Sequence, residues 1–361
     1  MDPLLIVGQF NVPAASAAVL HGSGLIHDTY VVSCAGGGRY ILQRINSQVF
    51  RNVPAVQENI QRVTDHLRRK VAAEGGDPAR EVLALIPTTE GKSFCRTGAG
   101  REFWRMYRFI EGARTYDAAT PAQAYEAARA FGRFQRLLAD LPDPLLHETI
   151  AGFHHTPSRF EAFMRAAQTD AAGRAAAAAA EIDFALARHD IVAVLEDLAA
   201  AGSLPRRAVH NDTKLNNVLI DDATGKGLCV IDLDTVMPGL SVIDFGDCCR
   251  TAAATTAEDD PDTSRMRVNL EMFTALARGY LSEARTFLTA DEIEHLPLAA
   301  RLITFEQGLR FLTDWLAGDV YYKTARPAHN LDRTRAQFKL VQEFEAAHET
   351  MTSIIRQCLQ D

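Results

Sequence analysis

Hydrophobic and polar positions change their period along the chain near residue 115. In the first part, short apolar runs at 23–33, 39–45, 82–86 and 103–109 alternate with glycine-containing or polar turns, which is typical of β-strands. Between them, residues 54–73 repeat an apolar side chain every three or four positions, which predicts a helix. This order of hairpin, helix and further strands predicts a small antiparallel β lobe.

Beyond residue 115 the helical period dominates. Seven segments have the spacing of amphipathic helices, and they cover 121–139, 157–169, 173–188, 190–201, 264–286, 290–317 and 330–358. We therefore expect an α+β protein with an N-terminal lobe in residues 1–108, a boundary at 109–112 and a large, mostly helical C-terminal lobe in 113–361.

A second hairpin interrupts the helical part. Apolar strands at 218–220 and 228–231 flank a polar turn at 221–227. This arrangement places Asn217 just before one strand and Asp232 just after the other. Both oxygen-bearing side chains therefore lie at the same end of the hairpin, where one Mg²⁺ ion can bridge them.

The polar loop before this hairpin reads HNDTKLNN and contains a second pattern. Lys214 follows Asp212 by two residues and Asn217 follows it by five, which is the spacing of a protein-kinase catalytic loop. A lone D-x-x-x-x-N match would be read as a capped turn. Together with Asp232 after the hairpin, the pattern predicts a base at Asp212, a γ-phosphate contact at Lys214 and a Mg²⁺ site at Asn217 and Asp232. The sequence thus predicts a protein-kinase-like two-lobe fold and an ATP-dependent kinase.

Two further residues lie near this pattern, His210 at the start of the loop and Asp234 after the hairpin. His210 is expected to brace the loop through a hydrogen bond rather than to transfer protons. Asp234 is either a further metal-site group or a turn residue, and the sequence leaves both open.

The nucleotide contacts of the small lobe are predicted less completely. Gly22, Ser23 and Gly24 lie at the start of the segment that leads into the first predicted strand, and glycine backbone can approach phosphates closely, although a short G-x-G is a weak motif. Tyr30 and Arg44 are further candidate nucleotide contacts. However, a glutamine occupies the position before Arg44 where kinases place a strand lysine, and Arg44 itself faces the other way in an ideal strand. The group that neutralises the α- and β-phosphates stays open.

The motifs HNDTKLNN, IDLDTVMPG and DFGD together resemble the bacterial N-acetylhexosamine 1-kinases, within the aminoglycoside phosphotransferase and choline kinase superfamily. The resemblance continues in the same order over nearly the whole chain, through YILQRIN (40–46), FIEG (109–112), ETIAGFHHTPSRFEAF (148–163), LRFLTDWLAGDVYY (309–322) and HNLDRTRAQFKLVQE (329–343). It implies Mg²⁺- and ATP-dependent phosphorylation of the anomeric hydroxyl of N-acetylglucosamine or N-acetylgalactosamine.

The resemblance also implies roles for single residues. The backbone of Phe109, Ile110 and Glu111 resembles the hinge that hydrogen-bonds adenine. Asp244 in VIDFGD resembles the second aspartate after the hairpin, which holds the catalytic loop by hydrogen bonds.

For the acceptor sugar, the resemblance implies contacts at Arg310, Asp314 and Tyr321, together with the base Asp212. These three residues recur at i, i+4 and i+11, on one helix face of about 3.6 residues per turn. Read from the residues alone, Arg310 and Asp314 are a solvated ion pair. His27 stands where the related kinases often have asparagine, and it is a further candidate sugar contact.

Composition limits the partners. The chain has 361 residues, 47% of them hydrophobic, and a net charge of −8 without a long basic run, so we expect neither a nucleic acid nor a membrane as partner. The start of the sequence does not read as a signal peptide, and none of the six cysteines lies in a C-x-x-C spacing. The expectation is a cytoplasmic monomer that binds ATP and a small sugar.

Two alternatives remain at this stage. The acceptor could instead be another sugar, an aminoglycoside or an amino alcohol, for which the acidic stretch 258–262 could line a cleft, although it also reads as a solvated loop. The second alternative is a catalytically silent nucleotide-binding protein of the same fold, which only the missing strand lysine favours.

Overall fold

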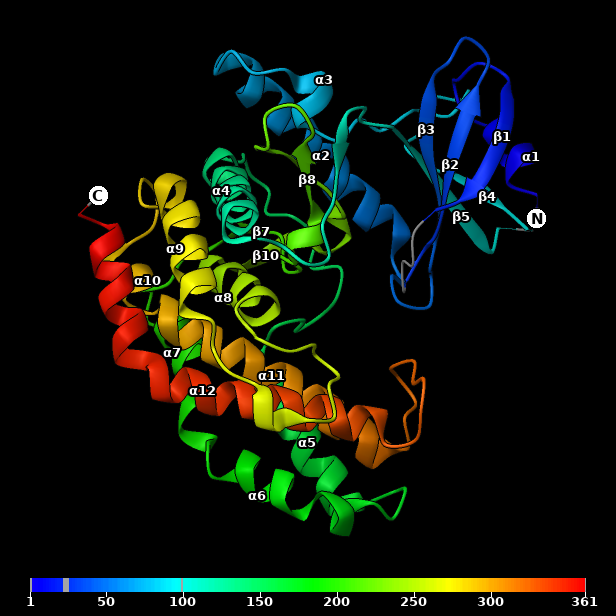
Figure 1. The fold of residues 1–361 in the computed structure, drawn as a ribbon. Helices are drawn as coiled ribbons and strands as arrows, with labels where there is room; N and C mark the ends of the chain where they lie inside the picture. Colours follow the sequence, from blue (N-terminus) through cyan, green and yellow to red (C-terminus); the bar gives the residue numbers. More distant parts are fainter. Residues whose placement is uncertain (1, 22–25, 99, 361) are drawn as a thin grey trace.

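The computed structural model describes residues 2–21, 26–98 and 100–360 and confirms the α+β, two-lobe fold (Figure 1). The N-terminal lobe is built on a five-stranded antiparallel sheet in the order β1-β2-β3-β5-β4. Its strands are β1 (Ala15–Leu20), β2 (Asp28–Cys34), β3 (Arg39–Ile45), β4 (Cys95–Thr97) and β5 (Glu102–Arg108).

The two faces of this sheet have different neighbours. Val32, Leu42 and Met106 pack with the short helix α1 (Pro3–Val7) in a small hydrophobic core. Side chains alternate along a strand, so the intervening positions face the other way. Tyr107 accordingly belongs to the main core that continues into the C-terminal lobe. The odd-numbered positions of β3 and β5 thus face the interior between the lobes.

Helix α2 (Val53–Ala73) connects the two lobes. The side chain of Asn52 caps it by accepting a hydrogen bond from the Ala55 N–H. In the middle of α2, Asn59 Nδ2 donates to the carbonyl oxygens of His147 (2.8 Å) and Val236 (3.0 Å), both in the C-terminal part of the chain. These two bonds fix α2 relative to the C-terminal lobe.

Residues 109–112 run between β5 and β6 (Ala113–Arg114). Strand β6 pairs with β8 (Val218–Asp221), which pairs with β9 (Gly227–Val230), in a three-stranded sheet. A separate two-stranded sheet joins β7 (Arg206–Val209) to β10 (Met237–Leu240).

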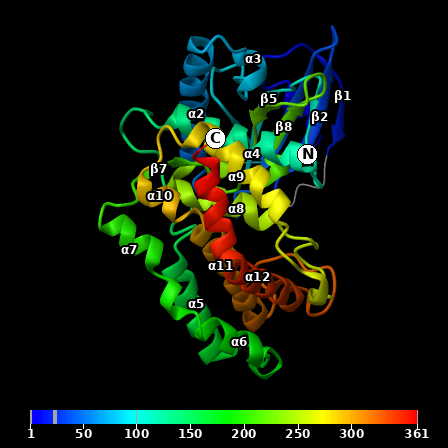
Figure 2. The ribbon, with the colours of Figure 1, turned by 60° about the vertical axis from the view of Figure 1, so that its left-hand side comes forward.

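The C-terminal lobe is mainly helical (Figures 1 and 2). Its longer helices are α4 (Pro121–Leu138), α5 (Thr156–Thr169), α8 (Ser241–Ala252), α9 (Leu270–Ala284), α11 (Leu296–Ala317) and α12 (His329–Cys358). The shorter ones are α6 (Ala179–Leu186), α7 (Val194–Ala200) and α10 (Ala290–Glu294), whereas the short helix α3 (Pro78–Glu81) follows α2 in the N-terminal lobe. Single 3₁₀ turns are η1 (Ala175–Ala178), η2 (His189–Ile191), η3 (Leu215–Asn217), η4 (Leu233–Thr235) and η5 (Thr263–Arg265).

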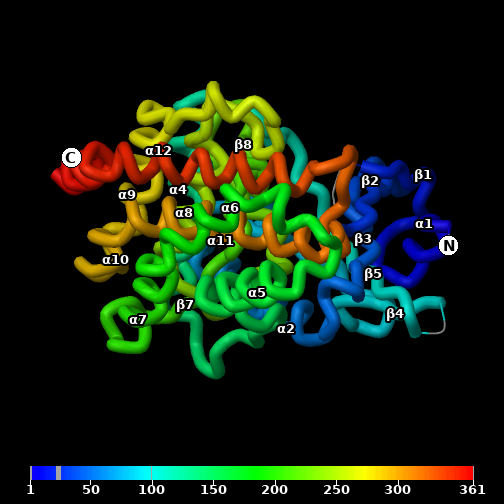
Figure 3. The backbone as a smooth tube through the Cα atoms, turned by 90° about the horizontal axis from the view of Figure 1, so that it is seen from below, coloured from blue at the N-terminus to red at the C-terminus, as the bar shows by residue number. Residues whose placement is uncertain are grey.

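The helices stack in pairs. Helix α4 packs against α9, and α11 packs against both α12 and α8. Seen from below, α12 and α11 run side by side along the lobe, and the two chain ends lie at opposite sides of the molecule (Figure 3).

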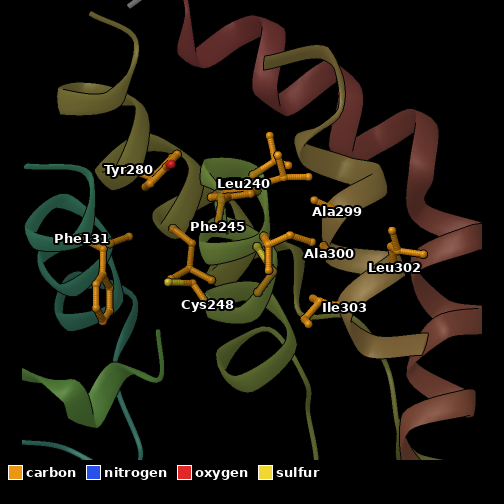
Figure 4. Packing of buried hydrophobic residues seen from close by; sticks show 14 of the residues in the cluster. Phe131, Leu240, Phe245, Cys248, Tyr280, Ala299, Ala300, Leu302 and Ile303 are labelled. Carbon is orange, nitrogen blue, oxygen red and sulfur yellow. The ribbon is translucent and has the colours of Figure 1, made fainter. Parts of the chain in front are cut away.

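Helix α8 forms the centre of this lobe. Phe245 and Cys248 lie among Phe131 of α4, Tyr280 of α9 and Ala299 of α11 (Figure 4). The close approach of α8 and α11 depends on Gly246, where a Cβ would lie 2.6 Å from the Ala299 carbonyl oxygen. The helix that carries Asp244 is therefore held rigidly.

Several predicted elements differ from the structure. Residues 82–86 are not a strand, although the Ile86 N–H bonds the Met106 carbonyl oxygen on β5 (2.8 Å). Segment 290–317 is two helices, because the chain breaks at His295, just before α11 starts. Helix α9 begins later than predicted, where the Asn269 side chain caps it. No segment in the described part of the chain is a helix long and apolar enough to cross a membrane.

Candidate active site

The second hairpin has the predicted geometry. Val218 pairs with Val230, and the Ile231 N–H donates to the Asn217 carbonyl oxygen at 2.9 Å. Asn217 and Asp232 therefore flank the same end of β8 and β9, as the sequence predicts.

The loop before β8 brings its three polar side chains together. Lys214 Nζ lies 2.9 Å from Asp212 Oδ1. Asn217 Nδ2 donates to the Asp212 carbonyl oxygen (2.8 Å) and lies 3.4 Å from Asp212 Oδ2. The Asp212 side chain is about one quarter exposed (24%), so an acceptor hydroxyl can reach it.

Asp244 fixes the backbone of this loop through hydrogen bonds. Its two carboxylate oxygens accept hydrogen bonds from the backbone N–H groups of His210 and Asn211, each at 2.8 Å. Asn211 has a φ of +64°, a left-handed conformation that costs free energy unless the surroundings impose it. Gln135 Nε2 of α4 donates to Asp244 at 2.6 Å and completes the support. The geometry agrees with the loop-holding role inferred for Asp244.

His210 is fully buried and lies under the same loop. Its Nε2 donates to the Ile231 carbonyl oxygen (2.9 Å), and its Nδ1 accepts from the Asp212 N–H (3.3 Å). Phe131 and Phe134 pack edge-on against the ring. Both ring nitrogens are thus engaged with backbone, which favours a bracing role over proton transfer.

Asp232 has the surroundings of a cation ligand. Burial raises the pKa of its carboxyl, and the neighbouring carboxylates of Asp234 and Asp212 raise it further. A divalent cation at this position would offset that repulsion, and Asn217 offers a second oxygen. Among residues 2–21, 26–98 and 100–360, no three His, Cys, Asp or Glu side chains cluster as a metal site. Mg²⁺ would therefore fit here only with phosphate oxygens and water completing its shell.

Asp234, which the sequence left open, is a buried ion-pair partner. Arg105 donates to it with both terminal nitrogens, at 2.6 and 2.5 Å. His27 Nε2 lies 3.3 Å away, and its Nδ1 accepts the Asn46 N–H at 3.0 Å, which sets the ring orientation. Burial raises the pKa of Asp234, but Arg105 and His27 outweigh it, so the pKa is lowered. His27 thus lies at this ion pair, and Arg105 is a residue that the sequence interpretation missed.

Two candidate nucleotide contacts lie on the opposite face of the sheet. Arg44 pairs with Asp28 and Glu102 at the surface, and Tyr30 packs on Trp104 over the small core. Both side chains face away from the interior between the lobes, so we leave them out of the proposed nucleotide site. Gly22, Ser23 and Gly24 lie outside the described residues.

The segment 109–112 has part of its backbone engaged. The Phe109 N–H donates to the Arg39 carbonyl oxygen (3.2 Å), and the Glu111 carbonyl oxygen accepts from Arg80 (3.0 Å). The Glu111 side chain is paired with Arg39. Adenine is therefore expected at the remaining backbone groups, including those of Ile110.

Arg310 lies among aromatic rings and near a second arginine. Its guanidinium is 5.4 Å from the Phe153 ring and 5.9 Å from the Tyr322 ring. Arg159 donates from Nη2 to the Phe153 carbonyl oxygen (2.9 Å), while its buried Nε has no hydrogen-bond partner. Burial lowers the pKa of Arg159, and the positive charge of Arg310 lowers it further. We call Phe153, Arg159, Arg310 and Tyr322 the arginine–aromatic cluster.

Asp314 does not pair with Arg310. Its carboxylate accepts the backbone N–H groups of Val320, Tyr321 and Tyr322, at 2.8–2.9 Å, and is 4% exposed. Asp314 therefore shapes the loop that presents the two tyrosines and is better described as a brace than as a sugar contact. Tyr321 lies on that loop with 65% exposure, edge-on to Tyr322.

His154 links the arginine–aromatic cluster to the catalytic loop. Its Nδ1 lies 2.8 Å from Glu306 Oε1, and its Nε2 lies 2.9 Å from the Asn211 carbonyl oxygen. Both partners only accept, so both nitrogens must carry protons. Burial lowers the pKa of His154, but Glu306 outweighs it and the pKa is raised. Glu306 lies one turn before Arg310 on α11, so this contact connects the cluster to the backbone of Asn211, the residue before Asp212.

The acidic stretch 258–262 has cationic partners of its own. Glu258 pairs with Arg250, and Asp259 lies 2.9 Å from His329 Nε2. Asp260 pairs with Arg265 at 3.0 Å. The carboxylates of Glu258, Asp259 and Asp260 thus already have hydrogen-bonding or ion-pair partners within the protein.

Comparison with known proteins identifies the family. The sequence profile described as the phosphotransferase enzyme family (APH) matches residues 18–278, about 70% of the chain. Over the whole chain, several solved structures share the fold.

Three of them illustrate the range. An aminoglycoside phosphotransferase from Alicyclobacillus acidocaldarius is 15% identical over 100% of this chain and 96% of its own, with a TM-score of 0.59. Spectinomycin phosphotransferase in complex with ADP and spectinomycin is 14% identical over 96% and 97%, with a TM-score of 0.60. A microcompartment-associated aminopropanol kinase is 16% identical over 97% and 98%, with a TM-score of 0.56. At such identities the likeness establishes the fold alone.

Proposed function

Because the chain belongs to the phosphotransferase enzyme family, we propose that it transfers the γ-phosphoryl group of ATP to the anomeric hydroxyl of an N-acetylhexosamine. N-acetylglucosamine and N-acetylgalactosamine are the proposed acceptors. The observation that carries the phosphotransfer part is the convergence of Asp212, Lys214, Asn217 and Asp232 at one end of the β8–β9 hairpin.

In the proposed reaction, Asp212 orients the sugar hydroxyl and accepts its proton as the new O–P bond forms. The bond between the γ-phosphorus and the bridging oxygen breaks, and ADP leaves. Lys214 is within 2.9 Å of Asp212, so its ammonium can turn to the transferring phosphoryl group. Mg²⁺, held by Asn217, Asp232 and phosphate oxygens, would neutralise charge on the β- and γ-phosphates.

The arginine–aromatic cluster supports a neutral polyhydroxy acceptor. Two guanidinium groups, Arg159 and Arg310, supply hydrogen-bond donors to hydroxyl and acetamido oxygens. The buried carboxylate nearest to them, Glu306, already accepts from His154 and Thr156. A cationic acceptor would be repelled by these two guanidinium groups, and Glu306 is not free to compensate its charge. A neutral sugar would not be repelled.

The competing acceptor is an aminoglycoside or an amino alcohol. The similar solved structures favour it, because they include an aminoglycoside phosphotransferase and an aminopropanol kinase. The ion pairs of the 258–262 stretch with Arg250, Arg265 and Arg326 speak against it. A catalytically silent protein is supported still less, because such a protein has no need of the assembled catalytic loop.

The test is ADP formation by the purified protein with Mg²⁺, ATP and a panel of acceptors. N-acetylglucosamine and N-acetylgalactosamine should stimulate turnover, whereas kanamycin, ethanolamine and 1-aminopropan-2-ol should not. Methyl glycosides of the same N-acetylhexosamines are the matched controls, since they lack only the anomeric hydroxyl. Turnover with the cationic acceptors alone would reject the sugar assignment, and the absence of turnover with every acceptor would favour the silent protein.

A further inference from the structure

The inner face of the N-terminal sheet carries a buried cation in a place that the kinase pattern does not predict. Gln43 of β3 occupies the position where kinases have a lysine, and Arg105 lies directly opposite it on β5. Paired residues of neighbouring strands share a face, so both side chains turn to the interior between the lobes. Arg105 Nε donates to Gln43 Oε1 at 2.9 Å, which orients the guanidinium.

The guanidinium lies next to the groups that border the proposed nucleotide site. It forms a forked pair with Asp234, two residues after the metal-ligand candidate Asp232. Asp234 also contacts His27, which follows the segment 22–25. The side chains of Arg105 and Asp234 are only 1% and 3% exposed, so an uncompensated charge on either would be costly.

We infer that Arg105 binds the α- and β-phosphates of ATP in place of the strand lysine, and that Asp234 holds its guanidinium ready for them. The inference rests on the proposed use of ATP. The three bonds to Gln43 and Asp234 use three of the five N–H donors of a guanidinium, which leaves two for phosphate oxygens. Arginine also suits this task because its planar fork matches phosphate geometry.

This arrangement preserves the charge pair of a kinase N-lobe while moving both partners. In protein kinases a strand lysine pairs with a glutamate of the following helix. Here the cation comes from β5 and the anion from η4. Glu58 of α2 is consistent with this exchange, because it pairs with His147 at 2.9 Å and is more than half exposed. Gln43 then orients Arg105 and does not itself take over the role of the strand lysine.

The test compares two variants that differ only in whether Arg105 is present. Asp234→Asn and the double variant Asp234→Asn with Arg105→Gln both lack the buried carboxylate, so neither leaves Asp234 charged and unpaired. Calorimetry with Mg²⁺ measures the affinities for adenosine, ADP and a non-hydrolysable ATP analogue. Arg108→Gln, an exposed arginine on the same strand, is the control and should leave all three affinities unchanged.

The double variant should bind ADP and the ATP analogue ~10–100-fold more weakly than Asp234→Asn, the loss expected for a charge-assisted hydrogen bond, with adenosine affinity unchanged. If Arg105 only supports the fold, all three ligands weaken together, and that result overturns the inference. Unchanged ADP and analogue affinities overturn it as well. Failure of the wild-type protein to bind any nucleotide contradicts the proposed function instead.

Arg105→Lys provides a second route if the double variant does not fold. Lysine keeps the positive charge but loses the fork, so ADP and analogue affinity should fall, by less than in the double variant, with adenosine affinity again unchanged. Equal weakening of adenosine and ADP would assign Arg105 a structural role only.

Discussion

At the scale of single residues, the surroundings of each side chain in the proposed site limit the chemistry that it can perform. Asp212 lies against the Lys214 ammonium and the Asn217 amide, and its backbone is fixed through His210 and Asp244. A carboxylate held this way can orient a hydroxyl and take its proton, whereas an amide of the same shape cannot take a proton.

Asp212→Asn should therefore lower kcat by about 10²–10⁴-fold, the usual contribution of a positioned base. The affinity for nucleotide should stay within a few-fold of wild type, because asparagine preserves the shape of the loop. Steady-state kinetics and calorimetry with an ATP analogue measure the two effects. A variant that retained more than a tenth of wild-type kcat would exclude Asp212 as the base.

Arg310→Ala should raise the KM for the sugar and leave the KM for ATP almost unchanged. An arginine that hydrogen-bonds a neutral sugar contributes about 1.5–3 kcal/mol, or roughly 10–150-fold in affinity. Arg285→Ala, at an exposed position after α9, is the control. Equal changes in both KM values, or none, would show that Arg310 has no selective part in acceptor binding.

Some of these residues were predictable from sequence and others were not. Asp212, Lys214 and Asn217 lie within six residues, so their spacing alone brings them together. Arg105 and its partner Asp234 are 129 positions apart, and only the strand register of β3 and β5 brings the arginine to the interior face. Arg159 is likewise recognisable only once α5 is placed beside α11.

At the scale of elements, the contact between the 148–155 segment and α11 joins the proposed acceptor site to the proposed catalytic loop. His154 bridges Glu306 of α11 and the backbone of Asn211, next to the base. The sequence shows this histidine only as one of two in the run 148–163, and it cannot show that both of its nitrogens meet acceptors.

This bridge predicts a pH dependence of stability. Because the folded state raises the pKa of His154, the bridge stabilises fully below the unfolded value of about 6.5 and weakens as pH rises through the folded value. His154→Gln should therefore destabilise the protein more at pH 6 than at pH 8.5. Urea unfolding across this range measures the difference, and a constant difference would contradict the charged bridge.

Glu306→Gln is the matched control for the same bridge. It removes the carboxylate that holds the proton on His154, so it should abolish most of the same pH dependence. A variant with the wild-type pH dependence would locate the titrating group elsewhere.

The elements themselves were predicted unevenly for a physical reason. Helices α4 and α12 have a polar and an apolar side and were predicted nearly to their ends. Helix α8 was missed, because it is buried on all sides and so lacks an amphipathic period. Strand β1 was missed as well; it is only partly buried and carries small side chains.

At the scale of the whole molecule, the two lobes place chemistry from distant parts of the sequence at one interface. To the proposed site, β5 contributes Arg105, the residue before β2 contributes His27, the hairpin contributes Asn217 and Asp232, and α11 contributes Arg310. The division at residues 109–112 stays a proposal, supported by the passage of the chain from β5 to β6 there. The proposed preference for a neutral acceptor likewise depends on several elements, since it rests on the charges of Arg159, Arg310 and Glu306 together.

The most direct test of the central claim is proton-coupled phosphorus NMR of the product formed from ATP and N-acetylglucosamine. The anomeric hydroxyl is the most acidic of the ring, so a carboxylate such as Asp212 suffices to orient it. Transfer to the anomeric hydroxyl should give a sugar phosphate whose phosphorus couples to H1, together with equimolar ADP. A phosphorus signal coupled to the C6 protons, or no sugar phosphate at all, would contradict the account.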